Sequence, residues 1–278
     1  MMELDTVLRA LLFISPVIAG VVLVIYARSP TGVKGFDNLS RRDTKRRAEQ
    51  GDAQAQNNFG AMYLHGRGVF PRNTTKAAEW FRQAAKQGLA PAQHNLGVMY
   101  ANGKGVPQDD TQAAEWFRRA AEQGFTAAQY NLGVMYDKGK GVPQDDTQAV
   151  KWYHQAAEQG FAGAQHNLGT MYDKGRGVSQ DDTQAANWYR RAADQGLADA
   201  QHNLGIMYVK GEGVPQDDTQ AAEWYRKAAK QGIIEAQFGL ALLYGEGRGV
   251  PQNYTQAIKW FFRARRKRAL QKLKKILT

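Results

Sequence analysis

Residues 88–124 read GLAPAQHNLGVMYANGKGVPQDDTQAAEWFRRAAEQG, and close copies of this stretch fill most of the 278-residue chain. Tryptophan marks the spacing, because each one follows the previous one by 36 residues. The six are Trp80, Trp116, Trp152, Trp188, Trp224 and Trp260. A period between about 20 and 50 residues is typical of solenoids, propellers and helical arrays. The chain is therefore predicted to be an array of one repeated unit.

Each copy predicts two helices. Apolar residues recur three and four positions apart over residues 92–100 and again over residues 113–121, which is the spacing of one helix face. The second helix begins with a capping box, because Asp109 stands three residues before Gln112 and its side chain can accept from free backbone N–H groups. The sequence therefore predicts an all-α protein built from helix pairs.

The Asp-Asp pairs of the inner copies would also suit a metal site or a general base. Asparagine replaces the first aspartate at Asn73 in the first copy and at Asn253 in the last. Asparagine caps a helix as well as aspartate does but has no carboxylate, so the exchange favours capping. No nucleophile with a neighbouring base recurs either. We therefore predict a protein that is not an enzyme and assign no catalytic, cofactor or metal site.

Glycines mark the turns of each copy. Gly88 and Gly124 fall where a second helix ends, as a left-handed C-cap requires, and Gly103 and Gly105 lie in the loop between the helices. The Gly-x-Gly pair is a turn, because it lacks the strand and the third glycine of a dinucleotide site. Gly97 lies inside the first helix at a cost of about 1 kcal/mol relative to alanine. We expect a neighbouring tryptophan ring to pack over it.

The unit combines Ala-x-x-x-Leu-Gly-x-x-Tyr, then Gly-x-Gly-Val-x-x-Asp-x-x-x-Ala, then Trp followed by Ala-Ala-x-x-Gly. This pattern resembles the Sel1-like repeat, a relative of the tetratricopeptide repeat. The resemblance implies a right-handed α-solenoid of six two-helix repeats over residues 51–262. It also implies binding of other proteins or peptides, often as an adaptor in membrane-linked or envelope processes. Departures are small, such as Ser179 in place of proline in the fourth copy.

Residues 10–27 form a run of 18 residues without a charged side chain. This is about the minimum length for a helix that spans a bilayer. We predict a single transmembrane helix at residues 7–27, after a flank at residues 1–6. A cleaved signal peptide is the main alternative, but the chain start is acidic and the apolar run is long for one. A buried core helix is the third interpretation. Residues 28–50 read as a basic linker that becomes a lead-in helix.

Charge indicates which side of the membrane the array occupies. The net charge is +11, yet residues 51–262 hold 21 basic and 21 acidic side chains. The excess lies in residues 28–50 and 263–278. Basic residues that follow the span closely favour a cytoplasmic array. A periplasmic or secreted array is the alternative, and the absence of cysteine fits either compartment.

Ligand discrimination is expected where one register varies between copies on the exposed face of the first helix. Two registers four residues apart qualify, and they would line a groove for an extended peptide or a partner helix. The first register holds Asn57, His94, Tyr130, His166, His202 and Phe238, and the second holds Ala61, Val98, Val134, Thr170, Ile206 and Leu242. Packing between repeats is the competing interpretation of both registers.

Residues 263–278 form a basic tail. Its charged residues are Arg263, Arg265, Arg266, Lys267, Arg268, Lys272, Lys274 and Lys275. The tail is predicted to be a capping helix of the array, and binding to anionic lipid is the alternative. Nucleic acid is disfavoured, because the array adds no net charge to the tail.

These features together predict a membrane-anchored, non-enzymatic adaptor that binds a protein or peptide in its helical groove. The alternative function is an exported, envelope-side array that recognises cell-wall material or a host protein.

Overall fold

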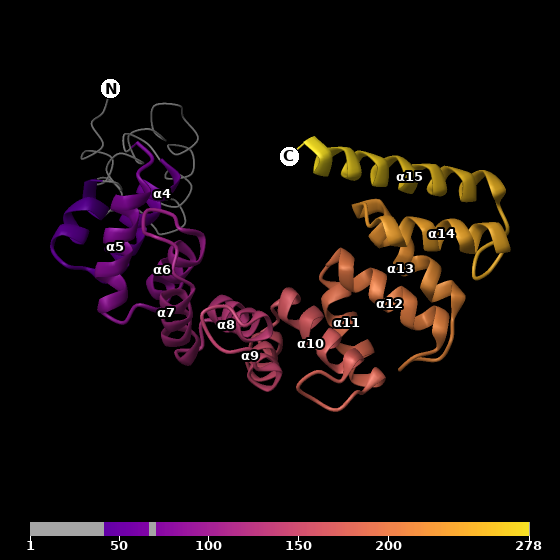
Figure 1. The fold of residues 1–278 in the computed structure, drawn as a ribbon, viewed down its shortest axis with the longest axis horizontal. Coiled ribbons are helices and arrows are strands. Elements are labelled where there is room, and N and C mark those ends of the chain that lie inside the picture. The colour runs from indigo at the N-terminus through magenta and orange to yellow at the C-terminus, as the bar shows by residue number, and fades with distance from the viewer. Residues whose placement is uncertain (1–41, 67–70, 278) are drawn as a thin grey trace, which may run out of the picture. The chain divides into compact units, whose positions relative to one another are not determined.

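The computed structural model describes residues 42–66 and 71–277, with side chains as far as Gln271. These residues form antiparallel helix pairs (Figure 1), which confirms the predicted all-α array. The right-handed sense of the solenoid stays a prediction. The predicted span at residues 7–27 lies outside the described residues. Within the described part, no helix has the length and apolar character needed to cross a bilayer.

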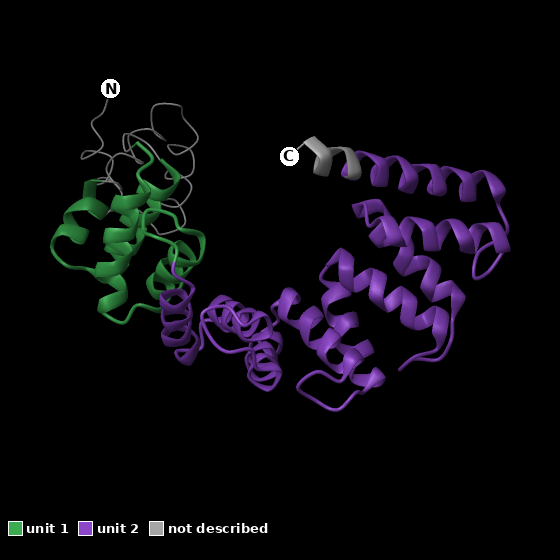
Figure 2. Ribbon diagram, viewed as in Figure 1, with its two compact units in different colours: residues 1–108 green, residues 109–278 purple. Residues whose placement is uncertain are grey.

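The chain divides into two compact units, Met1–Gln108 and Asp109–Thr278 (Figure 2). The first unit holds a helix at residues 42–49, then α4 (Ala53–His65), α5 (Thr74–Lys86) and α6 (Ala90–Asn102). The second unit holds α7 (Asp110–Glu122), α8 (Thr126–Lys138), α9 (Asp146–Glu158), α10 (Ala162–Lys174), α11 (Asp182–Asp194), α12 (Ala198–Lys210), α13 (Asp218–Gln231), α14 (Ile234–Glu246) and α15 (Tyr254–Leu277). Even-numbered helices are the first helices of the repeats, and odd-numbered helices are the second helices.

The predicted N-caps are present at the second helices. The Asp145 carboxylate accepts a hydrogen bond at 3.0 Å from the backbone N–H three residues later, and Asp181 accepts the equivalent bond at 2.9 Å. Asn73 and Asn253 accept the same bond at 2.9 Å. The capping interpretation is therefore confirmed at both aspartate and asparagine positions.

The loop glycines are required by backbone geometry. Gly139 and Gly141 have φ of 62° and 67°, in the left-handed region that favours glycine. A Cβ on Gly141 would also overlap the backbone carbonyl of Asp110 at the start of α7. The loop of one repeat therefore rests directly on the second helix of the repeat before it.

The glycine inside the first helix contacts a different ring from the one predicted. A Cβ on Gly205 would lie 2.6 Å from Cδ1 of Tyr225, and one on Gly169 would lie 2.8 Å from Cδ1 of Tyr189. The ring belongs to the residue after the tryptophan, so the prediction of a tryptophan ring was wrong. Neighbouring residues of a helix point about 100° apart, so Trp224 and Tyr225 reach different surfaces.

The tryptophans instead join consecutive second helices. Trp224 lies in the same core cluster as Ala185 and Ala192 of α11, and Trp260 lies in the cluster of the α13 alanines. A cation covers the outer ring face, as where Lys227 Nζ lies 3.6 Å from the Trp224 ring centroid. The 36-residue spacing of the tryptophans therefore reflects one such contact between consecutive second helices in each repeat.

A row of buried glutamines, which the sequence analysis did not single out, also connects the repeats. Gln165 Nε2 donates to the Ala157 carbonyl at 3.1 Å, and Gln165 Oε1 accepts from Gln195 at 2.8 Å. In the last repeat Lys267 takes the place of this second glutamine and donates to a backbone carbonyl. Within the described residues, Gln237 Oε1 consequently has no hydrogen-bond donor.

We expect Gly205→Ala to lower the free energy of unfolding by about 1–3 kcal/mol, because the new methyl group overlaps the buried Tyr225 ring. Gly245→Ala is the matched control, since Gly245 is also a helical glycine but its Cβ would meet only Ala257 Cβ, at 3.9 Å. Alanine there should raise the free energy of unfolding by up to about 1 kcal/mol. Urea unfolding followed by circular dichroism measures both. Equal effects of the two substitutions would contradict the ring contact.

Candidate functional site

The first helices carry both predicted registers. His94 and Val98 lie on α6 in the first unit. On α8, α10, α12 and α14 of the second unit the pairs are Tyr130 with Val134, His166 with Thr170, His202 with Ile206, and Phe238 with Leu242. All these side chains are half-buried except Leu242, which is 55% exposed. Each register therefore contributes both to packing and to the surface.

First-register rings pack against an aromatic ring of the second helix in the same repeat. The His166 ring centroid lies 5.6 Å from that of Tyr189, and the His202 centroid lies 5.8 Å from that of Tyr225. Burial raises the pKa of the Tyr189 hydroxyl to about 12, and this hydroxyl donates to Thr170 Oγ1 at 3.1 Å. These ring contacts support the packing interpretation of the first register.

The lowered pKa values of two first-register histidines agree with a packing role. Burial lowers the pKa of His94 and of His202, and the opposing effects of Asn95 on the first and Glu235 on the second are smaller. Both imidazoles are therefore neutral at neutral pH. Across the described ranges, no group of three or more His, Cys, Asp or Glu side chains is placed to hold a metal ion.

An asparagine beside the first register bridges adjacent first helices. Asn95 donates to Asn57 Oδ1 at 2.9 Å, and Asn203 Nδ2 lies 3.2 Å from His166 Nε2. The sequence analysis looked for ligand contacts only at registers that vary between copies and so overlooked these amides. Their recurrence next to a variable position was the available signal.

One kind of pocket recurs between adjacent first helices. In the first unit a pocket of 350 Å³ is lined by residues that include Asn95, Val98 and Met99 of α6 with Leu64 and His65 of α4. In the second unit a pocket of 250 Å³ is lined by residues that include Asn203, Ile206 and Met207 of α12 with Thr170, Asp173 and Lys174 of α10. The α6 and α12 residues occupy the same registers. The second register therefore lines open surface at these two junctions.

An arginine bridges two carboxylates at the junction of α8 and α10. Arg176 Nη2 donates to Asp137 Oδ1 at 2.7 Å and to Asp146 Oδ1 at 2.6 Å. Burial alone would raise the pKa of Asp137, but hydrogen bonds from Lys138 and Arg176 outweigh it and hold that pKa below its ordinary value. The carboxylates at this junction are therefore neutralised within the chain.

The next junction keeps the acids and loses the arginine. Asp173 and Asp182 follow Asp137 and Asp146 by 36 residues, and Glu212 stands where Arg176 stands in the previous repeat. Burial and the nearby Asp182 raise the pKa of Asp173. Asp173 and Glu212 both line the pocket between α10 and α12. Lys174 and Lys210 line it as well, and Lys210 Nζ lies 3.2 Å from Glu212 Oε2. This junction therefore differs from the one before it in having a glutamate, paired with a lysine, in the place of the bridging arginine.

The repeat pattern decides the family. Six consecutive segments match the family model of the Sel1 repeat, at residues 53–89, 90–125, 126–161, 162–197, 198–233 and 234–267. The chain belongs to the Sel1 repeat family. Sel1-repeat proteins are generally protein-interaction scaffolds and are typically non-catalytic. The predicted family and repeat number are confirmed.

Two solved Sel1-repeat structures are similar over most of this chain. A protective antigen present in uropathogenic Escherichia coli strains is 43% identical with a TM-score of 0.79, and the match covers 82% of this chain and 48% of that one. A Sel1 repeat protein from Oxalobacter formigenes is 33% identical with a TM-score of 0.68, covering 86% and 88%. This chain thus spans about half of the E. coli protein. The search of curated proteins gave no match.

The basic tail continues the second helix of the sixth Sel1 repeat. α15 runs without interruption from Tyr254 to Leu277. Trp260 and Ala264 are buried, whereas Phe262 and Leu270 are 59% and 54% exposed. The capping and lipid-binding roles of the tail both stay predictions.

We expect Arg176→Glu to lower the free energy of unfolding by about 1–3 kcal/mol, because three carboxylates would then share a half-buried site. Glu212→Arg should raise it by up to about 1 kcal/mol, since a guanidinium there can bridge Asp173 and Asp182. Thermal unfolding at low and high salt measures both changes. Lys140→Glu makes the same charge change as Arg176→Glu at an exposed residue of the same register. An equal effect of these two substitutions would refute the bridge.

Proposed function

We propose that this Sel1-repeat array is a non-enzymatic scaffold whose first helices bind an extended segment of a protein partner. The binding surface, called the first-helix face here, consists of the second-register residues and the adjacent asparagines within each compact unit. The recurrence of one pocket at equivalent registers of α6 and α12 carries this proposal. A repeated pocket suits a ligand that presents side chains at regular intervals.

The spacing of the pockets suits a particular peptide conformation. Adjacent packed helices lie about 8–10 Å apart. A peptide in the polyproline II conformation repeats every three residues and rises about 9 Å in that length. Within one unit, every third side chain can therefore enter a successive junction. The asparagine amides, which both donate and accept, can bond to the solvated peptide backbone.

Charge gives this surface a preference along its length. At the α10–α12 junction, Glu212 pairs with Lys210 at 3.2 Å, whereas Asp173 lies near Asp182 and has a glutamate where the previous repeat has Arg176. Asp173 and Asp182 therefore favour a basic side chain of the partner. The intramolecular contact of Arg176 with Asp137 and Asp146 shows the geometry that a guanidinium adopts against such carboxylates. We propose that the partner places an arginine at this junction.

Membrane attachment through residues 7–27, with the array on the cytoplasmic side, is also part of the proposal. Its support is the uncharged run in that segment and the seven basic residues between Arg28 and Arg47. The alternative is an exported array that recognises cell-wall material or a host protein. The description of the similar E. coli protein as a protective antigen favours that alternative.

Photo-crosslinking in living cells tests the first-helix face. We expect p-benzoylphenylalanine at Val134 or Ile206 to give a discrete crosslinked partner band. Lys151 and Lys227 are exposed on second helices, and p-benzoylphenylalanine in place of either lysine should give no crosslinked band. Glu212→Arg should weaken the Ile206 crosslink more than the Val134 crosslink. Crosslinking from the second helices alone would contradict the assignment of the face.

Reporter fusions after Thr278 test the location of the array. A reporter that is active only in the cytoplasm should give signal, and one that is active only outside it should be silent, because the basic residues follow the span. Replacing the basic residues between Arg28 and Arg47 by glutamine should reduce this bias. The reverse reporter pattern in the unmodified chain would establish the exported alternative.

A further inference from the structure

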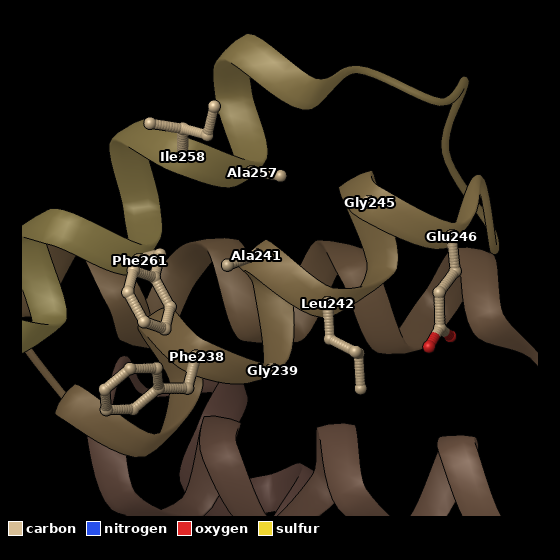
Figure 3. A pocket seen from close by; sticks show the side chains of 9 residues that line it. All are labelled: Phe238, Gly239, Ala241, Leu242, Gly245, Glu246, Ala257, Ile258 and Phe261. Atoms are coloured by element: carbon tan, nitrogen blue, oxygen red, sulfur yellow. The ribbon is translucent and has the colours of Figure 1, made fainter.

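The C-terminal end of the array exposes an apolar surface, called the end face here. Ile258 and Phe261 on α15 are 56% and 43% exposed, and Leu242 on α14 is 55% exposed. With Phe238 they surround an apolar cavity of 580 Å³ (Figure 3). In this view the Phe238 and Phe261 rings lie on one side of the cavity, and Glu246 marks the other end. An exposed apolar surface with a shaped cavity is typical of an interaction site.

Inner repeats show what covers this register elsewhere. Ala222 and Tyr225 of α13 correspond to Ile258 and Phe261, and they are only 1% and 7% exposed. The following first helix, α14, covers them: a Cβ on Gly239 would lie 2.8 Å from Cε2 of Tyr225. The end face therefore continues the surface that the following first helix covers in the inner repeats.

The end face is also bordered by basic residues of α15. Arg265 stands in the register of the fully buried Ala229, and residues 263–271 contain no acidic side chain. A helix that covers α15 as α14 covers α13 would run antiparallel to it and begin near Arg265. First helices α12 and α14 carry Asp199 and Glu235 in their first turns. Acidic residues at a helix N-terminus are favourable, and such a first turn would begin near the basic part of α15.

We infer that the end face binds an amphipathic helix of a partner protein, with an acidic first turn and an apolar stripe over Ile258 and Phe261. A single helix suffices for such a role at the opposite end of the array, where residues 42–49 pack on α4. There Gln56 Nε2 donates to the Ala48 carbonyl at 3.2 Å. The end face shares Leu242 with the first-helix face, but Ile258 and Phe261 of α15 are not part of that face, so the inference does not rest on the proposed function.

A second copy of the chain is the less favourable occupant. Its first helices α8 to α14 are already packed within its own array, and α4 is covered by residues 42–49. Two end faces in contact would bring Arg265 and Arg268 of one copy towards those of the other. Like charges in a desolvated interface are unfavourable.

Fluorescence anisotropy with a defined helical peptide tests the inference. The probe is a fluorescein-labelled, hydrocarbon-stapled peptide with the sequence of residues 233–247, and the protein is the full chain. We expect saturable binding, and the double variant Ile258→Ala with Phe261→Ala should weaken it about 30-fold. Phe262→Ala is the matched control, because Phe262 is 59% exposed on the same helix but does not line the cavity. A Glu235→Lys version of the peptide should bind about fivefold more weakly.

Absence of saturable binding, or an equal loss with Phe262→Ala, would overturn the inference. Because the chain has no cysteine, Ile258→Cys provides a second measurement. Maleimide should label this thiol rapidly in the free chain, and the peptide should slow the reaction. Slow labelling that does not depend on protein concentration would identify another segment of the chain as the occupant. Labelling that is slow at high protein concentration and becomes faster on dilution would identify a second copy. Either result would overturn the partner helix.

Discussion

Close packing of alanine-rich second helices determines how each repeat sits on the one before it. Ala185, Ala186, Ala192 and Ala193 of α11 are at most 2% exposed, and their small side chains leave room for Trp224 of the next repeat. In a solenoid each repeat contacts only its neighbours, so this one contact sets the register of everything else. The glutamine bonds, the loop contacts of Gly141 and the pockets between first helices all depend on it.

The sequence predicted features that depend on local chemistry. The period, the caps such as Asp145 and Asn253, and the positive φ of Gly139 follow from residues close together in the chain. The ring over Gly205 was assigned wrongly. The 36-residue period shows that Trp224 is equivalent to the other tryptophans, but it does not show whether Trp224 or the adjacent Tyr225 faces α12. Gln165 was overlooked for a related reason, since its partners belong to neighbouring repeats.

The candidate site was only half predictable. Variation between copies pointed to Val98 and Ile206, and both line pockets. The amides of Asn95 and Asn203 were not found, because a residue that recurs unchanged can both stack the repeats and form the surface. The bridge of Arg176 was also hidden, since its carboxylate partners lie 30 and 39 residues earlier in the chain. Only the stacked arrangement brings them together.

Repetition creates a problem of register for any extended partner. If all junctions were equivalent, a peptide that repeats every three residues would bind equally well when shifted by one repeat. The middle residue of Gly-x-Gly distinguishes the copies, because in the six copies it is Arg67, Lys104, Lys140, Arg176, Glu212 and Arg248. Five of these positions are basic, and one is acidic. For a partner of the proposed kind, a single basic residue would therefore meet a basic side chain at most junctions and the pair Asp173 and Asp182, without a bridging arginine, at one. In an array of near-identical units, the departures from the repeat supply the specificity that the repeat itself lacks.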